Sequence, residues 1–221
     1  RDHKGQPSLG IANIERFAAN SDVVAVLGGI HSHVVVAEQD TLHRLGLPLL
    51  APWSSAASVL GHHFQPNHIF RDSANAAQVA PFLVEHVGKR FRKPAVLVEN
   101  SEWGRGMQRD LGRQFALAGL QVADEAVFNR GASDFRGEIA RIRAKGADVL
   151  VMAANPLEGQ HIVREMAAQP QPLPIVAHWG ITGSDLWAAN RDVLGKRELD
   201  IFQTVSLIDN PHPQARALAQ R

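Results

Sequence analysis

Residues 22–55 read DVVAVLGGIHSHVVVAEQDTLHRLGLPLLAPWSS, and this stretch decides the fold. It opens with a continuous apolar run, 23–27, which is typical of a parallel strand covered by helices on both faces. Gly28 and Gly29 end that run, a helical pattern follows, and a second apolar run, 48–51, leads into another turn. The stretch is therefore one strand–helix–strand unit with a polar turn at the carboxyl end of each strand.

These two turns place hydrogen-bond donors at one edge of the predicted sheet. Ser32 is expected to be the N-cap of the helix, so the first backbone N–H groups of that helix are free to point beyond the strand ends. The second turn carries Trp53, Ser54 and Ser55 before a short helical stretch. An anion is the expected guest at such helix starts, and both turns converge on one crevice.

The composition is that of an ordinary globular protein of the α/β class. The chain has 221 residues, of which 45% are hydrophobic and 20% charged. Its 23 basic and 22 acidic residues are interspersed, which gives no electrostatic footprint for nucleic acid or for a membrane surface. No apolar run approaches the roughly 18 residues of a membrane span, so no membrane insertion of this segment is expected. The absence of cysteine excludes disulfides, thiolate catalysis and cysteine-based zinc sites.

The strand–helix pattern starts again after a joint at 72–75. Further strands are predicted at 95–98, 122–128, 148–153, 175–177 and 201–207, with helices between them. The fold class is therefore α/β, with two Rossmann-like lobes that have parallel sheets and are joined by a hinge. We expect a first lobe over 1–74, a second lobe over 75–205, and a segment at 206–221 that returns toward the first lobe. No strand precedes the first helix and the last pattern stops midway, so the chain is expected to be truncated at both ends. The first lobe is expected to be incomplete, with apolar surface around 23–27 less covered than in a whole lobe.

Four stretches, in order, resemble one known family. They are LGGIHSHVVVAEQDTLHRLGLPLLAPWSSAASVL (27–60), HIFRDSANAAQ (68–78), AVLVENSEWGRGMQRDLGRQF (95–115) and SDFRGEIARIRAKGADVLVMAANPLEGQHIVREM (133–166). The family is that of the periplasmic solute-binding proteins of the branched-chain amino acid (Leu/Ile/Val) type, which have the type I periplasmic fold and serve ABC importers. The resemblance implies an exported protein, periplasmic or extracellular, without a cofactor. Its implied partners are an amino acid or other carboxylate and an ABC transporter permease.

The resemblance also implies which residues meet the ligand. Ser32 and the turn from Trp53 to Ser55 match the positions that hold the ligand's carboxylate, although residue preference alone makes both serines helix caps. Trp103 matches the aromatic side chain that packs on the ligand from the second lobe, and the alternative is a partly buried core tryptophan. Its place in a glycine-flanked turn rather than on a periodic apolar face favours the ligand-binding role. The expected ligand-binding residues are Ser32, Trp53, Ser54, Ser55, Trp103, Asn155, His178 and Trp179. Neither catalytic residues nor metal ligands are expected.

This sequence departs from the family's amino-acid binders at two positions. Their carboxylate for the ligand's ammonium lies in the turn where this chain has Trp179, and a common tyrosine is replaced in the Ala154–Asn155 turn. Glu158 is the alternative anion, but its place further along a predicted helix indicates a solvated side chain. A buried ammonium without a carboxylate partner costs several kcal/mol, so the sequence favours a carboxylate without an α-amino group, such as an aromatic or aliphatic acid.

Two other functions stay open at this point. The same module serves as the ligand-binding sensor head of membrane signalling receptors. A Rossmann-like or flavodoxin-like enzyme is the second alternative, but GGIHSH is not a GxGxxG phosphate loop and no catalytic acid–base pair is found. The eleven histidines lack metal-binding spacing such as HxxxH on one helix, so they are expected at the surface.

Overall fold

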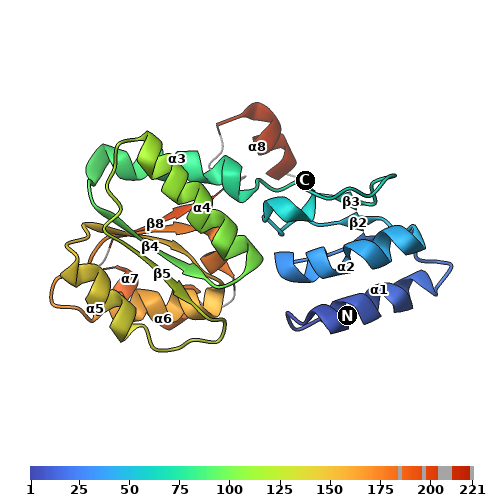
Figure 1. The fold of residues 1–221 in the computed structure, drawn as a ribbon, viewed down its shortest axis with the longest axis horizontal. Coiled ribbons are helices and arrows are strands. Elements are labelled where there is room, and N and C mark those ends of the chain that lie inside the picture. Colours follow the sequence, from blue (N-terminus) through green and yellow to red (C-terminus); the bar gives the residue numbers. More distant parts are fainter. Residues whose placement is uncertain (184–185, 196–197, 204–210, 220–221) are drawn as a thin grey trace.

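The computed structural model describes residues 1–183, 186–195, 198–203 and 211–219. It contains two parallel sheets, each packed with helices, that form two lobes side by side (Figure 1). The first sheet has the order β1-β2-β3 and the second has the order β5-β4-β6-β7-β8. The predicted α/β class with two Rossmann-like lobes is therefore confirmed.

The first lobe is a small sheet with helices. Its elements are α1 (Pro7–Ala18), β1 (Val26–Leu27), α2 (Ser32–Leu45), β2 (Leu49–Leu50), η1 (Ala57–Val59) and β3 (Ile69–Phe70). In the parallel register Leu49 lies between Val26 and Ile69. These residues pack in one core with apolar side chains of α1 and α2, including Ile14 and Leu42. The next residue of each strand points to the opposite face of the sheet.

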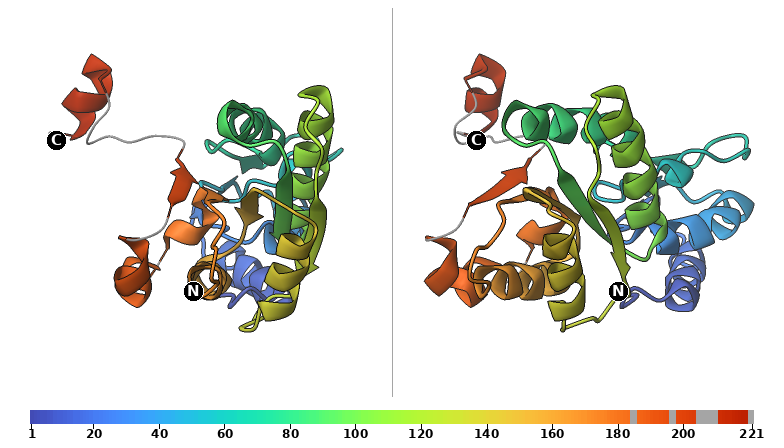
Figure 2. Two further views of the ribbon diagram at one scale, coloured as in Figure 1. Left: turned by 90° about the vertical axis from the view of Figure 1, so that its left-hand side faces the viewer. Right: turned by 60° about the vertical axis from the view of Figure 1, so that its left-hand side comes forward.

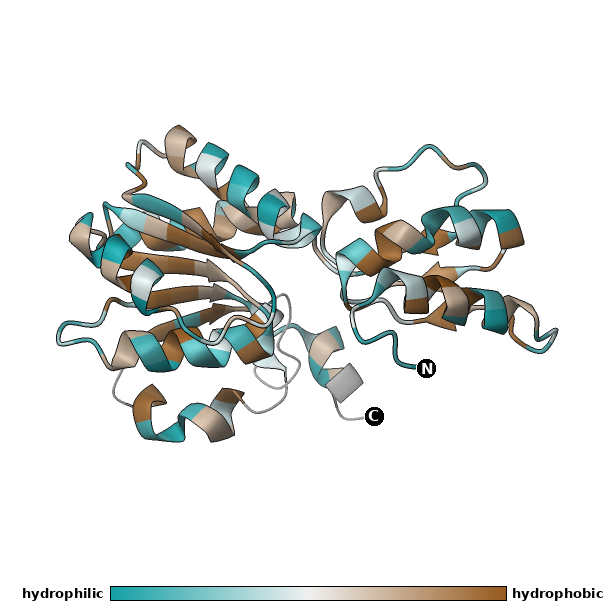
Figure 3. Cartoon of the chain, turned by 60° about the horizontal axis from the view of Figure 1, so that its bottom comes forward, coloured by the Kyte–Doolittle hydropathy of each residue, from teal (hydrophilic) through white to brown (hydrophobic). Residues whose placement is uncertain are grey.

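The expected apolar surface around 23–27 is present, since Val24 and Leu27 are exposed. Cover on both faces, which the continuous apolar run indicates, is not found among the described residues. Among the described residues, α1 and α2 lie together in front of one face of the smaller sheet (Figure 3). On the other face Leu27, Leu50 and Phe70 are 74%, 47% and 49% exposed. An incomplete first lobe is expected to leave part of its sheet without covering helices, and the exposed apolar residues lie on that uncovered face.

The second lobe is larger and has helices on both faces of its sheet (Figure 2). Its elements are α3 (Ala76–Arg90), β4 (Pro94–Glu99), α4 (Glu102–Leu117), β5 (Asp124–Phe128), α5 (Arg136–Ala144), β6 (Val149–Ala153), α6 (Pro156–Ala167), β7 (Ile175–His178), η2 (Trp179–Thr182), α7 (Leu186–Leu194) and β8 (Leu199–Phe202). Val96 and Val98 of β4 share a core with α3 and α4, whereas Ala95 and Leu97 share one with α5 and α6. Cover on both faces explains why this strand reads as a continuous apolar run.

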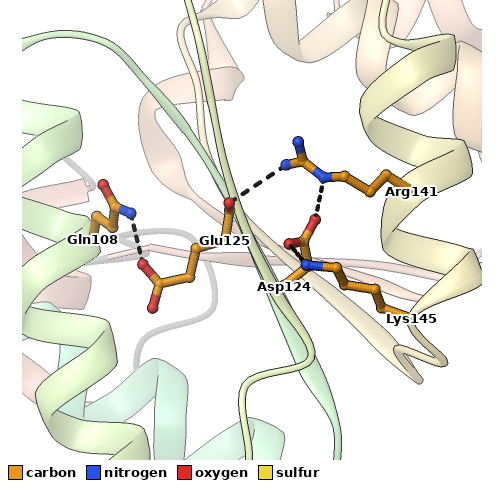
Figure 4. A network of polar contacts seen from close by, with 5 residues as sticks. All are labelled: Gln108, Asp124, Glu125, Arg141 and Lys145. Atoms are coloured by element: carbon orange, nitrogen blue, oxygen red, sulfur yellow. Dashed lines mark hydrogen bonds and ion pairs between the residues drawn. The ribbon is translucent and has the colours of Figure 1, made fainter.

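A buried carboxylate fastens α5 to β5 (Figure 4). Asp124, at the start of β5, accepts hydrogen bonds from Arg141 Nε at 2.7 Å and Lys145 Nζ at 2.8 Å. Burial would raise the pKa of Asp124, but hydrogen bonds and charge from the two cations outweigh burial and lower the pKa. On the other side of the strand, Gln108 of α4 donates to the Glu125 carboxylate at 2.6 Å. Helices on both faces of the sheet, α4 and α5, are thereby linked to the edge strand β5.

The crossing from the first lobe to the second runs through residues 71–75. Asn75 is the N-cap of α3, where it forms a capping box with Gln78 through two hydrogen bonds of 2.9 Å. Arg71 donates to the carbonyl of Ala56 at 2.8 Å, which holds the first-lobe end of the crossing. In the predicted return segment 206–221, α8 (Pro213–Ala219) is described, whereas 206–210 and 220–221 lie outside the described residues.

In the part of the chain that the structure describes, no helix is long and apolar enough to cross a membrane.

Candidate ligand-binding site

A narrow pocket lies between the two lobes, where the carboxyl ends of strands from both sheets meet. Its lining residues are Ile30, His31, Ser32, His33, Trp53 and Ser55 from the first lobe, and Glu99, Ser101, Trp103, Asn155, His178, Trp179 and Gly180 from the second. Seven of the eight residues expected from the sequence therefore line one pocket. The exception is Ser54.

Ser54 lies in the turn but not in the pocket. Its side chain is buried, and its hydroxyl donates to the carbonyl oxygen of Gly29 at 2.5 Å. Gly29 has φ +86°, a conformation that favours glycine, and a Cβ there would lie 2.6 Å from Val35. The Ser54 hydroxyl thus holds the two donor turns of the first lobe against each other.

The first-lobe wall presents hydroxyl and backbone donors. The structure corrects the helix start: His31 is the N-cap of α2, and Ser32 is its first residue. Ser32 Oγ accepts a hydrogen bond from the backbone of Ala56 at 3.2 Å, which joins the two turns. Neither the N–H groups of Ser32 and His33 nor the hydroxyl of Ser55 bonds to another described residue. Unpaired N–H groups at a helix start attract anions.

The second-lobe wall is aromatic. Trp103 lies in the first turn of α4, so the sequence-based placement in a turn before the helix is wrong. Ser101 caps this helix by accepting a hydrogen bond from Gly104 at 3.2 Å. A Cβ on Gly104 would lie 2.0 Å from the carbonyl of Glu99, so only glycine lets the helix start so close to the strand end. Trp103 is nearly buried and also belongs to the core between the lobes.

His178 is a buried neutral donor at the end of β7. Its Nδ1 accepts a hydrogen bond from the backbone of Gly180 at 3.0 Å, which places the ring proton on Nε2. Burial lowers the pKa of His178 to about 3, so the ring is neutral at pH 7. The ring packs on Trp179 at 3.7 Å and meets the edge of Trp103 at 4.9 Å between centroids. Both His178 Nε2 and Trp103 Nε1 are buried without a hydrogen-bond partner among the described residues.

Six lining residues were not expected from the sequence, and Glu99 is the one among them that carries a carboxylate. It ends β4, is 2% exposed, and accepts a hydrogen bond from the side-chain amide of Asn155. The inference that no anion faces the cleft is therefore wrong. A carboxylate closing an otherwise apolar strand, at the carboxyl edge of a parallel sheet, is the signal that would have found it.

Glu158 is also placed differently from the expectation. Its side chain is buried rather than solvated. The carboxylate accepts a hydrogen bond from the backbone N–H of Gly131 at 2.7 Å. It does not line the pocket, so it fixes the loop after β5 rather than facing a ligand.

The cavity within the pocket measures about 20 Å³. This is room for about one ordered water molecule, so any solute requires the two walls to move apart. Trp53 is 38% exposed and stands on the first-lobe side. Arg130 of the second lobe donates to the ring of His31 of the first at 2.6 Å, which is a direct contact between the lobes beside the pocket.

The sequence profile of the periplasmic binding protein family matches residues 1–221. This chain belongs to that family. Among its curated relatives, a Leu/Ile/Val-binding protein homolog from Brucella melitensis is 19% identical over 85% of this chain and 50% of its own. An amino acid binding protein from Pseudomonas aeruginosa is 21% identical over 84% of this chain and 50% of its own. The chain thus spans about half the length of the curated relatives it matches.

Solved structures of the periplasmic binding proteins share the fold. A solute-binding protein of an ABC transporter from R. palustris, in complex with benzoate, has a TM-score of 0.86 at 15% identity and covers 100% of this chain and 60% of its own. A leucine-binding protein from Thermotoga maritima has a TM-score of 0.83 at 17% identity, with 99% and 62% covered. Another R. palustris protein, in complex with 4-hydroxybenzoate, has a TM-score of 0.78 at 16% identity, with 87% and 53% covered.

Metal binding has no support in the described part of the chain, where no group of three His, Cys, Asp or Glu side chains is placed to hold an ion.

Proposed function

We propose that this periplasmic binding protein takes up a small carboxylate-bearing solute between its lobes and delivers it to an ABC importer of the branched-chain amino acid type. The observation that carries the proposal is the convergence of donors and aromatic surface on one pocket. Ser32, His33 and Ser55 offer hydroxyl or N–H groups from one lobe, and the tryptophans of the second lobe face them. The family's periplasmic setting supports an exported protein.

The first lobe is the proposed carboxylate subsite. The N-terminus of α2 carries a partial positive charge, and its free N–H groups lie beside the Ser55 hydroxyl. Hydrogen bonds to an ionised acceptor are stronger than neutral ones, so a carboxylate suits this set of donors. Benzoate and leucine, the solutes named for two structures of this fold, both carry that group.

The body of the solute is proposed to lie against the aromatic wall. Trp53, Trp103 and Trp179 offer apolar surface, and Asn155 and His178 offer neutral polar groups. Because the cavity is about 20 Å³, binding requires hinge opening at the 71–75 crossing, followed by closure on the solute. Each lobe then contributes contacts that exist together only in the closed protein.

Isothermal titration calorimetry of the complete protein tests this proposal. We expect at least one probe among leucine, 4-methylpentanoate, benzoate and 4-hydroxybenzoate to bind. Ser55→Ala should weaken that probe about tenfold through loss of a charge-assisted hydrogen bond. Ser58→Ala, a serine outside the pocket, is the matched control and should leave binding unchanged.

The alternative function, a Rossmann-like or flavodoxin-like enzyme, predicts binding of nucleotides instead of small carboxylates. Nucleotides and dinucleotides are added to the same protein in a thermal-shift series. Stabilisation by those compounds, with no heat from any small carboxylate, would overturn the proposed function.

A further inference from the structure

We infer that the solute also carries a hydroxyl group, and that this hydroxyl binds Glu99 in the second lobe. The inference rests on the proposed function, because it concerns the far end of the same pocket. It comes from three buried polar groups of the second lobe whose hydrogen-bonding capacity the described residues leave unfilled.

The first of these groups is the Glu99 carboxylate. It is 2% exposed, and Asn155 is its hydrogen-bond partner among the described residues. No ion pair joins Glu99 to a described Lys, Arg or His side chain. Buried carboxylates are ordinarily paired or fully hydrogen-bonded, because burial removes the water that would otherwise solvate them. Glu99 therefore has capacity for a donor from the solute.

The other two groups are N–H donors. His178 Nε2 and Trp103 Nε1 are buried without partners, and their rings meet at 4.9 Å. The bond from Gly180 to His178 Nδ1 fixes the tautomer, so the Nε2 atom is a donor rather than an acceptor. Both side chains line the same pocket as Glu99.

A hydroxyl is the small group that satisfies both kinds of partner. It donates one hydrogen bond, which Glu99 accepts, and it accepts through two lone pairs, which face the N–H groups. An ammonium has donors only, so it would satisfy Glu99 but leave both N–H groups unpaired. An unsubstituted carbon would leave both N–H groups unpaired and Glu99 with Asn155 as its partner among the described residues. The solute class is thus a hydroxy acid whose carboxylate faces the first lobe.

Two matched series of probes test the inference by calorimetry on the complete protein. The aromatic series contains the three monohydroxybenzoates, benzoate and 4-(aminomethyl)benzoate. The aliphatic series contains 2-hydroxy-4-methylpentanoate, 4-methylpentanoate and leucine. Within a series the members carry a hydroxyl, a hydrogen or an ammonium. The aromatic ammonium stands on an added methylene, because an amine bonded directly to the ring is not protonated at neutral pH. In whichever series binds, we expect a hydroxyl member to bind about tenfold tighter than both others.

Variants locate the hydroxyl contact. Glu99→Gln keeps an acceptor but removes its charge, so it should reduce the hydroxyl's advantage, and Glu99→Ala should abolish it. Glu102→Gln is the matched control, because that carboxylate is exposed three residues away and does not line the pocket. Circular dichroism melts verify that each variant is folded, and the comparison of probes in the unmodified protein does not depend on any variant.

The outcomes separate the two proposals. Equal binding of the hydroxyl and unsubstituted members, tighter binding of the ammonium member, or an advantage that survives Glu99→Ala contradicts the hydroxyl inference and leaves carboxylate binding standing. Absence of binding by every probe in both series overturns the proposed function, and the hydroxyl inference falls with it.

Discussion

At the scale of single residues, chemical character along the sequence was enough to find most of the pocket. Ser32, Trp53, Ser55 and Trp179 stand directly after or near strand ends, where side chains of a parallel sheet converge. Glu99 was missed because a carboxylate at a strand end is ordinarily solvated, and its burial depends on the turn of another strand. The sequence around Glu99 does not specify that packing.

His31 gives a residue-scale prediction. Burial, followed by the charge of Arg130 and the neighbouring His3 and His33, lowers the pKa of His31 to about 4, against a weaker raising effect of Asp2. We expect Arg130→Gln to raise the pKa of His31 toward its ordinary value. NMR titration of the imidazole nitrogens in the solute-free protein measures it.

The lowered pKa of His31 also makes the stability of the fold depend on pH. A depressed histidine pKa favours the neutral folded form, so the contribution to stability is complete above about 6.5 and is lost as pH falls toward 4. Arg136→Gln removes an exposed guanidinium paired with Asp134 and should leave His31 unchanged. A His31 pKa that does not move in Arg130→Gln would mean that this contact between the lobes does not persist in solution.

At the scale of elements, strands covered on both faces were predicted best. The runs 95–98 of β4 and 149–153 of β6 are apolar throughout and buried throughout, so composition alone identified them. The run at 23–27 has the same composition, but only Val26–Leu27 form a strand, β1, and one face of it is bare. Apolar character indicates a strand, but it does not say whether a helix covers each face.

The packing of α1 on α2 yields an element-scale prediction. Glu38 of α2 is buried against α1, where Gly10 leaves room for its carboxyl group. Burial raises the pKa of Glu38 from 4.5 to about 7. A raised carboxyl pKa stabilises the fold below about 4.5, and this stability is lost as pH rises through 7, by roughly 3 kcal/mol at 1.4 kcal/mol per pKa unit. Glu38→Gln should remove most of that loss.

Urea unfolding at pH 5 and pH 8 measures this difference. We expect the unmodified protein to lose more stability between the two pH values than Glu38→Gln does. Glu15→Gln, which removes an exposed carboxylate of α1, should behave like the unmodified protein. The same pH dependence in Glu38→Gln would show that Glu38 is solvated rather than packed between the helices.

At the scale of the whole molecule, the order of strands and helices predicted two lobes and a joint at 72–75. The sequence did not predict how far apart the lobes stand, because that distance depends on side-chain contacts such as Arg130 with His31. The result is a pocket with donors on one wall, aromatic rings and a carboxylate on the other, and a cavity of about 20 Å³ between them. Under the proposed function, solute binding is coupled to relative motion of the lobes.

The central claim is that a carboxylate solute binds between these two walls with its carboxylate on the first lobe. A crystal structure of the complete protein, with the tightest-binding probe of the two series, tests it most directly. We expect carboxylate oxygens within about 3 Å of the N–H groups of Ser32 and His33 or the Ser55 hydroxyl, with the other end of the probe against the second lobe. A probe bound outside this pocket, or one whose carboxylate faces the second lobe, would contradict it.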